Sequence, residues 1–538
     1  MKTRSLILFA FLFFFTQAIF SQVPGITSSN LPLVVINTNG QTIQVGGKIG
    51  AKMKVINNGV GKVNLPSDPG NNYDGIVGIE YRGTLTSGVQ NPYNFETRDA
   101  TGANLNVSLL GMPEENDWVL LANYDDKTFM RNTLAFQLFR KMSHYAPRTQ
   151  MVEVIINNEY QGIYLLAEKI KQDKGRVDIS KLTNTDISGD NLTGGYIFKI
   201  DTYDATNSWV SNYTPIDHPE KVVHYVYDSP EASKIVSQQK TYLKTFVNSF
   251  EAMLYGSAFA DKTIGYPAWI KLNSFMDYFI VSEVSRNINA YRKNCYYFKD
   301  KDSKDNKIHS GPVWEFDSAF KNIVDCDPYN ATDGSGWTYK INDCTTNTMN
   351  SNGWIVRLLQ DPAFADAVNA RYFEMRSSYL STQYINSFID SIQSQASEAE
   401  VRHYAKWNIL AASVGTPEVD PQPATYDGQV TKLKDWIQTR LNWLDGHMLG
   451  TTSTAENHES DVSCRVFPNP ARDVVYLESS YEIQRIGIYS NDGTCVMIKE
   501  GNSGFSTQLD VSGLSSGFYV VRLTLKGNHT INAKLVIK

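Results

Sequence analysis

Residues 277–321 read DYFIVSEVSRNINAYRKNCYYFKDKDSKDNKIHSGPVWEFDSAFK, and this stretch predicts four segments in a fixed order. Its first third carries apolar residues at helical spacing and predicts an amphipathic helix. The polar stretch 286–294 then predicts a loop, and the aromatic run 295–298 predicts a strand. After a charged turn, the chain returns through the short acidic motif GPVWEFD at 311–317.

A polar loop after a helix, followed by an acidic motif after a hairpin, is the order in which kinase-like folds place their catalytic loop and metal-binding carboxylate. Four segments carry a more specific resemblance: EVSRNINAY at 283–291, GPVWEFDSAF at 311–320, SLLGMPEENDW at 108–118 and YQGIYLLAEKIK at 160–171. On these motifs the chain resembles the CotH kinase family, and in particular its secreted members from Bacteroidetes-type bacteria.

The resemblance implies transfer of a phosphoryl group from ATP, with Mg²⁺, onto Ser or Thr of a surface protein. Asn289 stands where the family has its catalytic Asp, and Asn294 stands where a metal-binding Asn is expected. Glu315 and Asp317 are the acidic pair expected to bind Mg²⁺. The residues expected to contact the nucleotide, or to form an ion pair beside it, are Arg131, Glu168, Lys169 and Lys171.

Three departures from the family pattern leave two hypotheses open. The amide of Asn289 cannot accept a proton from a hydroxyl, although it can still orient a nucleophile by hydrogen bonding. Glu315 replaces an Asp and moves its carboxylate by one methylene, and Gln90 and Asn91 replace a Lys pair of the nucleotide-binding region. The chain is therefore either an active kinase or a catalytically inactive kinase-like surface module with a structural, adhesive or polymer-binding role.

The start of the chain has the pattern of a secretory signal peptide, predicted to cover residues 1–21. Lys2 and Arg4 precede an apolar run at 6–15 that is too short to span a bilayer comfortably. No other stretch is long and apolar enough to cross a membrane, so we expect no transmembrane anchor after cleavage. The net charge of −6 gives no reason to expect a nucleic-acid partner.

The end of the chain, residues 463–538, follows a polar linker at 450–462 and changes in character. Short alternating strands separated by turn residues predict a small all-β sandwich. The motifs FPNPA at 467–471 and LSSGFY at 514–519 resemble the C-terminal sorting domain of type IX secretion. The resemblance implies recognition by the type IX machinery, passage through the periplasm and outer membrane, and a secreted or cell-surface location.

Between these ends, residues 27–449 are predicted to form an α+β, atypical protein-kinase-like CotH domain with a β-rich N-terminal portion. Helical spacing predicts long helices in its second half, including one over 354–379. Cys326 and Cys344 bracket a polar loop and are expected to form a disulfide, and a pairing of Cys464 with Cys495 is left open. The eight histidines show no ligand spacing.

Overall fold

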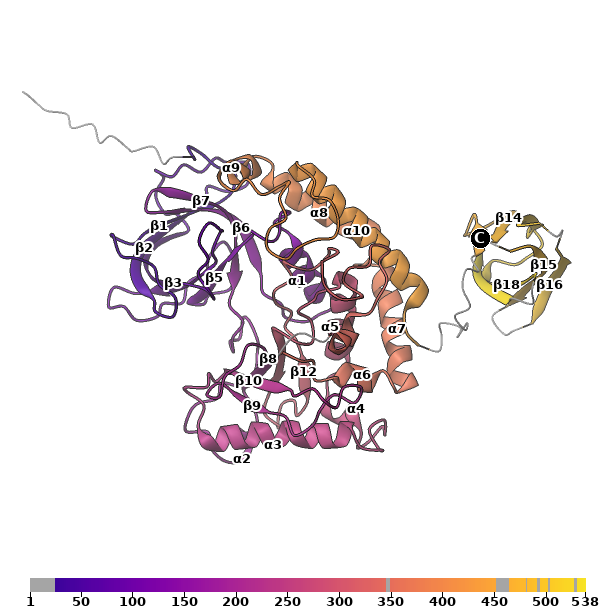
Figure 1. The fold of residues 1–538 in the computed structure, drawn as a ribbon, viewed down its shortest axis with the longest axis horizontal. Helices are drawn as coiled ribbons and strands as arrows, with labels where there is room; N and C mark the ends of the chain where they lie inside the picture. The colour runs from indigo at the N-terminus through magenta and orange to yellow at the C-terminus, as the bar shows by residue number, and fades with distance from the viewer. Residues whose placement is uncertain are drawn as a thin grey trace, which may run out of the picture. The chain divides into compact units, whose positions relative to one another are not determined.

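The computed structural model describes residues 25–344, 349–450, 464–479, 481–490, 494–501, 504–526 and 530–538. The chain divides into two compact units, Met1–Ser453 and Thr454–Lys538 (Figure 1). The predicted signal peptide and most of the predicted linker lie outside the described residues. Within the described ranges, no helix is both long and apolar enough to cross a membrane.

The first unit begins with a seven-stranded closed barrel in the order β1-β2-β3-β4-β5-β7-β6. Every neighbouring pair is antiparallel except β1 and β6, whose parallel pairing closes the barrel. Closure leaves the sheet without an exposed edge. The strands are β1 (Leu33–Asn37), β2 (Ile49–Ile56), β3 (Tyr73–Tyr81), β4 (Tyr93–Arg98), β5 (Asp117–Ala122), β6 (Thr149–Ile156) and β7 (Glu159–Glu168). The sequence predicted the β-rich portion but not its closure.

Two helices connect the barrel to the rest of the first unit. α1 (Arg131–Lys141) lies between β5 and β6 in the chain and packs against α5 (Leu272–Ser285). The ring of Phe136 on α1 stacks on Trp314 of the acidic motif at a centroid distance of 5.7 Å. Because α5 is buried from Ser274 to Ser285, it is the central helix of the unit, and the candidate catalytic loop begins at its end.

A five-stranded sheet in the order β12-β11-β8-β10-β9 lies beyond the barrel (Figure 1). The long helix α3 (Ser237–Leu254) packs on this sheet, with Tyr242 stacked on Tyr196 at 5.8 Å. Two short helices, α2 (Gly189–Leu192) and α4 (Tyr266–Trp269), flank it in the chain. The strands are β8 (Tyr196–Ile200), β9 (Ser208–Val210), β10 (His224–Ser229), β11 (Cys295–Lys299) and β12 (Ile308–Ser310).

The second half of the first unit is helical as predicted, but the segment 354–379 is divided into α6 (Trp354–Leu358) and α7 (Pro362–Arg376) and is not one continuous helix. Pro362 cannot donate a backbone hydrogen bond, and the side chain of Asp361 caps the next helix by accepting from Ala363 N. The chain therefore forms two helices there, and α9 (Ala399–Lys406), which packs against β7, was not predicted. The helices are η1 (Thr338–Asp343), α6 (Trp354–Leu358), α7 (Pro362–Arg376), α8 (Thr382–Ala396), α9 and α10 (Tyr426–His447).

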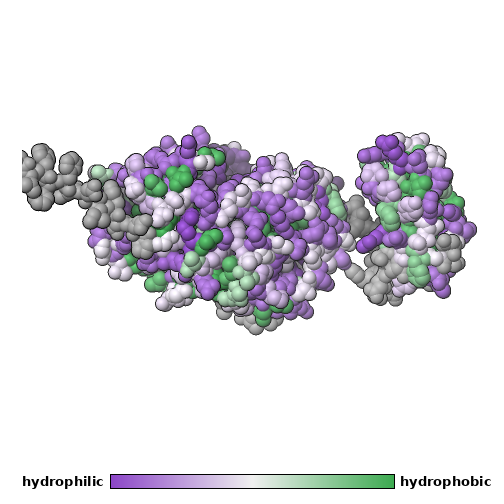
Figure 2. Space-filling model, turned by 90° about the horizontal axis from the view of Figure 1, so that it is seen from above, coloured by the Kyte–Doolittle hydropathy of each residue, from purple (hydrophilic) through white to green (hydrophobic). Residues whose placement is uncertain are grey.

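The second unit is the predicted all-β sandwich, with one sheet in the order β13-β14-β17 and another in the order β16-β15-β18-β19. Figure 2 shows apolar side chains on its visible face, and Val496, Ile498, Phe518 and Val520 are among the exposed apolar residues. The strands are β13 (Cys464–Phe467), β14 (Val474–Ser479), β15 (Ile483–Ser490), β16 (Cys495–Glu500), β17 (Ser506–Asp510), β18 (Gly517–Leu525) and β19 (Thr530–Ile537).

The cysteines resolve into one disulfide and three free thiols. Cys326 and Cys344 are bonded, with their Cα atoms 5.8 Å apart, which confirms the predicted bridge. Cys464 and Cys495 are both free, so the pairing left open for them does not occur. They lie on β13 and β16, which belong to different sheets of the sandwich.

Candidate active site

The polar loop that follows α5 is fixed against the acidic motif by the side chain of Asn287. Its amide nitrogen donates to the backbone oxygen of Glu315 at 3.2 Å, and its amide oxygen accepts from Asn289 N at 3.0 Å. Phe320 N also donates to the oxygen of Ser285, the last residue of α5, at 2.8 Å. The two sequence segments that predicted the site are therefore neighbours in the fold.

Left-handed backbone conformations are concentrated in this loop and motif. Arg286, Tyr291, Asn294 and Glu315 have φ angles of 45°, 67°, 52° and 55°. Residues other than glycine rarely adopt such angles, and they persist only where surrounding contacts hold them. Strained backbone of this kind is typical of functional sites, which supports this region as the candidate centre.

Glu315 is held by one amide and two cationic side chains. Asn294 donates a side-chain hydrogen bond to Glu315 Oε2. Lys293 Nζ lies 3.8 Å from the same oxygen, and Arg82 Nη2 lies 3.5 Å from Oε1. The Arg82 guanidinium also lies over the Trp314 ring, 5.3 Å from its centroid. Because the Arg82 and Lys293 side chains are 25% and 36% exposed, these cations remain accessible to an anionic ligand.

Asp317 is the acidic group of the motif that the protein leaves without a partner. Within the described ranges, no side-chain or backbone donor from another residue satisfies its carboxylate. Burial raises the pKa of Asp317 to about 7, and the negative charges of Asp125 and Glu315 act in the same direction against Lys321. The charged form of Asp317 is therefore unfavourable as the site stands, and a bound cation would relieve it.

The neighbouring carboxylate of Asp125 shows the opposite arrangement. It forms an ion pair with Lys321 at 2.7 Å and accepts hydrogen bonds from Ser318 Oγ and from both the backbone nitrogen and the hydroxyl of Thr416. Asp125 is fully engaged in holding the motif to the loop that precedes α10. It is not a free ligand.

Asn289 lies in the loop with its side chain partly exposed. Its backbone oxygen accepts from Lys293 N at 2.9 Å, and its backbone nitrogen is held by Asn287. The side-chain amide makes no hydrogen bond to any other residue that the structure describes. It is thus available to orient a hydroxyl group, but it cannot remove the proton.

Arg131 has a structural environment. Its side chain is 2% exposed and forms an ion pair with Asp126 at 2.6 Å, while Asp126 also accepts from Arg131 N at the start of α1. The next residue, Asn132, accepts a hydrogen bond from Phe316 N at 2.7 Å. The start of α1 therefore positions the acidic motif, and the Arg131 guanidinium is already occupied.

Glu168 and Lys171 are likewise paired within the protein. Glu168 is fully buried and forms an ion pair with Arg148 at 2.7 Å. Lys171 lies 2.7 Å from carboxylate oxygens of both Glu115 and Asp117. Of the four residues predicted to contact the nucleotide, Lys169 alone has no ion pair to a described residue.

Lys169 and Lys171 line a cavity of about 1320 Å³ between the end of the barrel and the five-stranded sheet. Lys199 lies in the same cavity and contacts Asp201 at 2.9 Å and Asp228 at 3.1 Å. The five lysines of the lining are Lys169, Lys171, Lys181, Lys199 and Lys234. Four carboxylates, those of Asp117, Asp201, Asp228 and Glu231, also line the cavity, and they pair with Lys171, Lys199 and Lys234. Lys169 and Lys181 are the lysines of the lining without an ion pair to a described residue, and such ammonium groups suit phosphate.

Tyr296 contacts Lys199, which lines this cavity. Its hydroxyl accepts from Lys199 Nζ at 3.2 Å. Burial raises the pKa of Tyr296 to about 12, and the positive charges of both Lys199 and Arg82 lower it. Lys199 of the cavity and Arg82 beside Glu315 therefore both influence the charge state of Tyr296, which lies two positions after Asn294 in the chain.

Gln90 and Asn91, which are expected to stand in place of a Lys pair, have structural roles. Gln90 is buried, donates to Ile163 O at 2.8 Å and accepts from Asn123 N at 2.8 Å. Asn91 closes a turn with the backbone of Thr86. A lysine at position 90 would place a buried charge here and could not accept the hydrogen bond from Asn123 N. The barrel of this chain therefore requires an amide side chain at this position.

Comparisons with known proteins identify two families. A family model described as CotH kinase protein matches residues 79–444, and one described as secretion system C-terminal sorting domain matches residues 465–538. No curated protein matches the chain. Among solved structures, the crystal structure of CopC from Methylosinus trichosporium OB3b is 19% identical and covers 15% of this chain and 94% of that chain, with a TM-score of 0.12.

Proposed function

This chain belongs to the CotH kinase protein family, and from that premise we propose that it is a kinase-like enzyme that transfers a phosphoryl group from ATP to Ser or Thr of surface proteins. Its sorting domain indicates export to the cell surface or secretion by the type IX machinery. Its substrates are therefore exposed hydroxyl groups that it meets outside the cell.

The unpartnered carboxylate of Asp317 is the observation that carries the proposal. Magnesium takes oxygen ligands, keeps several waters, and usually binds through one or two carboxylates together with phosphate oxygens. Asp317 supplies one carboxylate, and the amide oxygen of Asn294 remains free because its nitrogen faces Glu315. This donor set fits Mg²⁺ without requiring a cluster of three carboxylates. Bound there, Mg²⁺ would supply charge neutralisation to the phosphates of ATP.

The cations of the site are arranged for an anionic cosubstrate. Arg82 and Lys293 lie beside Glu315, and the unpaired Lys169 lines the same cavity as Lys199. Phosphoryl transfer depends mainly on positioning and on stabilising charge, because its transition state is loose. An enzyme that lacks a general base at position 289 can therefore retain slow transfer, with Asn289 orienting the hydroxyl.

A second candidate function rests on the same contacts around Glu315. Because Arg82 and Lys293 already balance the charge of Glu315, this carboxylate needs no metal for its own stability. Together with Asn289 in place of the base, this favours a catalytically inactive module that binds a surface polymer or protein. Such a module would neither bind ATP with Mg²⁺ nor transfer phosphate.

The test is a transfer assay with radiolabelled ATP and Mg²⁺, using the protein itself and Ser/Thr peptides as acceptors. The wild-type chain should incorporate label slowly, and Asp317→Asn should incorporate none. Asp390→Asn, which changes an exposed carboxylate on α8, serves as the matched control and should behave as the wild type. Equal incorporation in Asp317→Asn and the wild type would reject the assigned role of Asp317.

A further inference from the structure

We propose that Asp217, His218 and Asp343 form a zinc site that joins the segment before β10 to the disulfide-closed loop. One ligand atom from each of these residues lies within 4.8 Å of the others. No other such group of three histidine, cysteine or acidic residues occurs in the described parts of the chain. The site is separate from the acidic motif at 315–317 and does not depend on the function proposed above.

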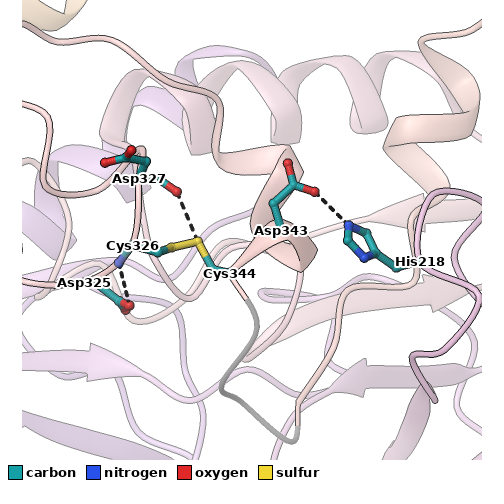
Figure 3. Close-up of a disulfide and its surroundings, with 6 residues drawn as sticks. All are labelled: His218, Asp325, Cys326, Asp327, Asp343 and Cys344. Carbon is teal, nitrogen blue, oxygen red and sulfur yellow. Dashed lines mark hydrogen bonds and ion pairs between the residues drawn. A yellow bond between two sulfur atoms is a disulfide. The ribbon is translucent and has the colours of Figure 1, made fainter.

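The imidazole of His218 is oriented as a metal ligand would be. Its Nε2 lies 2.7 Å from Asp343 Oδ1 (Figure 3). Its Nδ1 lies 3.0 Å from Glu220 Oε1 on the other side of the ring. Zinc-binding histidines usually donate their second ring nitrogen to a carboxylate, which fixes the tautomer and the ring plane. Glu220 supplies that partner and leaves Nε2 facing Asp343, while Asp217 completes the group of three.

The charge around His218 is unbalanced. Asp217, Glu220 and Asp343 place three carboxylates around one imidazole, and none of them has a lysine or arginine nitrogen within 4.0 Å among the described residues. A divalent cation would supply the missing positive charge.

Both ligand-bearing segments are held in place by contacts outside the cluster. Asp343 ends η1, whose first amides, Thr338 N and Tyr339 N, each donate to buried Glu283 at 2.8 Å. The next residue, Cys344, is bonded to Cys326 (Figure 3). The position of Asp343 is therefore set by the core and by the disulfide, not by its contact with His218.

The segment that carries Asp217 and His218 is fixed by a turn and by the close packing of Gly353 against Pro215. His218 N donates to Pro215 O at 3.1 Å, and Lys221 N donates to His218 O at 3.0 Å. A Cβ atom added at Gly353 would lie 2.8 Å from Pro215 Cβ and 3.7 Å from Asp217 Oδ1. The three ligands are thus brought together by two independently rigid segments.

Among Mg²⁺, Ca²⁺ and Zn²⁺, the donor set favours zinc. Calcium and magnesium take oxygen ligands, whereas imidazole together with carboxylate suits zinc. Three protein ligands leave one position of a tetrahedral zinc open to water. Asp217 and Asp343 are exposed, so water can reach that position.

The test is isothermal titration of the full-length, tag-free protein with Zn²⁺, repeated with Mg²⁺ and with Ca²⁺, and paired with thermal unfolding. The wild type should bind one Zn²⁺, should not bind Mg²⁺ or Ca²⁺ at these residues, and should unfold at a higher temperature with zinc. His218→Gln and Asp343→Asn should lose both effects, and Glu220→Gln should bind about tenfold more weakly.

His309→Gln is the matched control, because His309 pairs with Asp305 at 3.1 Å but belongs to no group of three ligands. It should bind Zn²⁺ as the wild type does. Absence of Zn²⁺ binding by the wild type would overturn the proposal. So would binding that is unchanged in both His218→Gln and Asp343→Asn. The circular dichroism of Asp343→Asn should match the wild type, since its exposed side chain holds no core contact.

Discussion

The side-chain amide of Asn294 donates a hydrogen bond to the carboxylate of Glu315. This contact joins the loop after α5 to the motif after β12, and it holds two residues that both have a left-handed backbone. Around this contact, the amide oxygen of Asn294, the side-chain amide of Asn289 and the carboxylate of Asp317 have no hydrogen-bond partner among the residues that the structure describes. These are the groups to which the proposed metal and nucleotide site assigns its roles.

Placing aspartate at positions 289 and 315 should raise the rate of phosphoryl transfer. Asn289→Asp supplies a proton acceptor, and Glu315→Asp shortens the side chain that Arg82 and Lys293 now hold. We expect the double variant to transfer phosphate faster than either single variant, because base and metal act as a unit and their effects need not add. The measurement is the single-turnover rate at saturating ATP and Mg²⁺.

Asn442→Asp, on the exposed face of α10, controls for the added charge and should leave the rate unchanged. A double variant that binds ATP as the wild type does, yet shows no gain in rate, would contradict the roles given to positions 289 and 315.

Removal of the disulfide should destabilise the first unit. The bridge closes a loop across a separation of 18 residues, and loop-closure entropy in the unfolded chain corresponds to about 3 kcal/mol. Cys326→Ser with Cys344→Ser should lower the free energy of unfolding by about that amount in urea titrations. Cys464→Ser with Cys495→Ser is the matched control, since those thiols are free.

Thiol labelling of the unfolded, unreduced protein gives an independent check. Cys295, Cys464 and Cys495 should react, and Cys326 and Cys344 should not. Labelling of all five cysteines would show that the bridge is absent.

His403 should make the first unit sensitive to acid. Burial lowers the pKa of His403 to about 3, while its Nδ1 accepts a hydrogen bond from Ile163 N at 3.1 Å. The unfolded chain, with a His pKa of about 6.5, binds the proton more readily than the folded chain between these values. The free energy of unfolding should therefore fall by up to about 1.4 kcal/mol for each pH unit below 6.5.

Urea unfolding at pH 7.5 and pH 5.0 measures this loss. His403→Gln keeps an acceptor for Ile163 N and should show a shallower dependence on pH than the wild type. His447→Gln, at the end of α10, is the control and should keep the wild-type dependence. Equal slopes in His403→Gln and the wild type would refute the role of His403.

Processing at both ends should be visible in the exported protein. The predicted signal peptide implies a mature N-terminus near Gln22, and the sorting domain implies loss of most of the chain after Gly450. Intact-mass measurement of the exported form compares the two ends directly. A mature protein that retains its C-terminus would contradict processing by the type IX route.

The parts of the fold that the sequence predicted are those set by local pattern. The hairpin of β6 and β7, the helix α5 and the strands of the sandwich each follow from spacing within one segment. Barrel closure depends instead on the parallel pairing of β1 with β6, which leaves no local signal. The amphipathic helix α9 is short, and its docking on β7 is a tertiary contact.

In the candidate site too, the residues within one sequence segment were predicted and those brought in by tertiary contacts were not. Asn289, Asn294, Glu315 and Asp317 were identified from one motif region, and the structure brings the loop and the motif together. Arg82 was missed because it lies 233 residues from Glu315 in the chain. The proposed zinc ligands were missed for the same reason, since His218 and Asp343 are 125 residues apart and only the fold joins them.

The central claim is that Asp317 binds Mg²⁺ together with ATP, and calorimetric titration of ATP tests it most directly. The wild-type protein should bind ATP with Mg²⁺ and should lose most of that affinity in EDTA. Asp317→Asn should bind ATP equally weakly with and without Mg²⁺, while Asp390→Asn should match the wild type. Failure of the wild type to bind ATP with Mg²⁺, or an unchanged Mg²⁺ dependence in Asp317→Asn, would contradict the account.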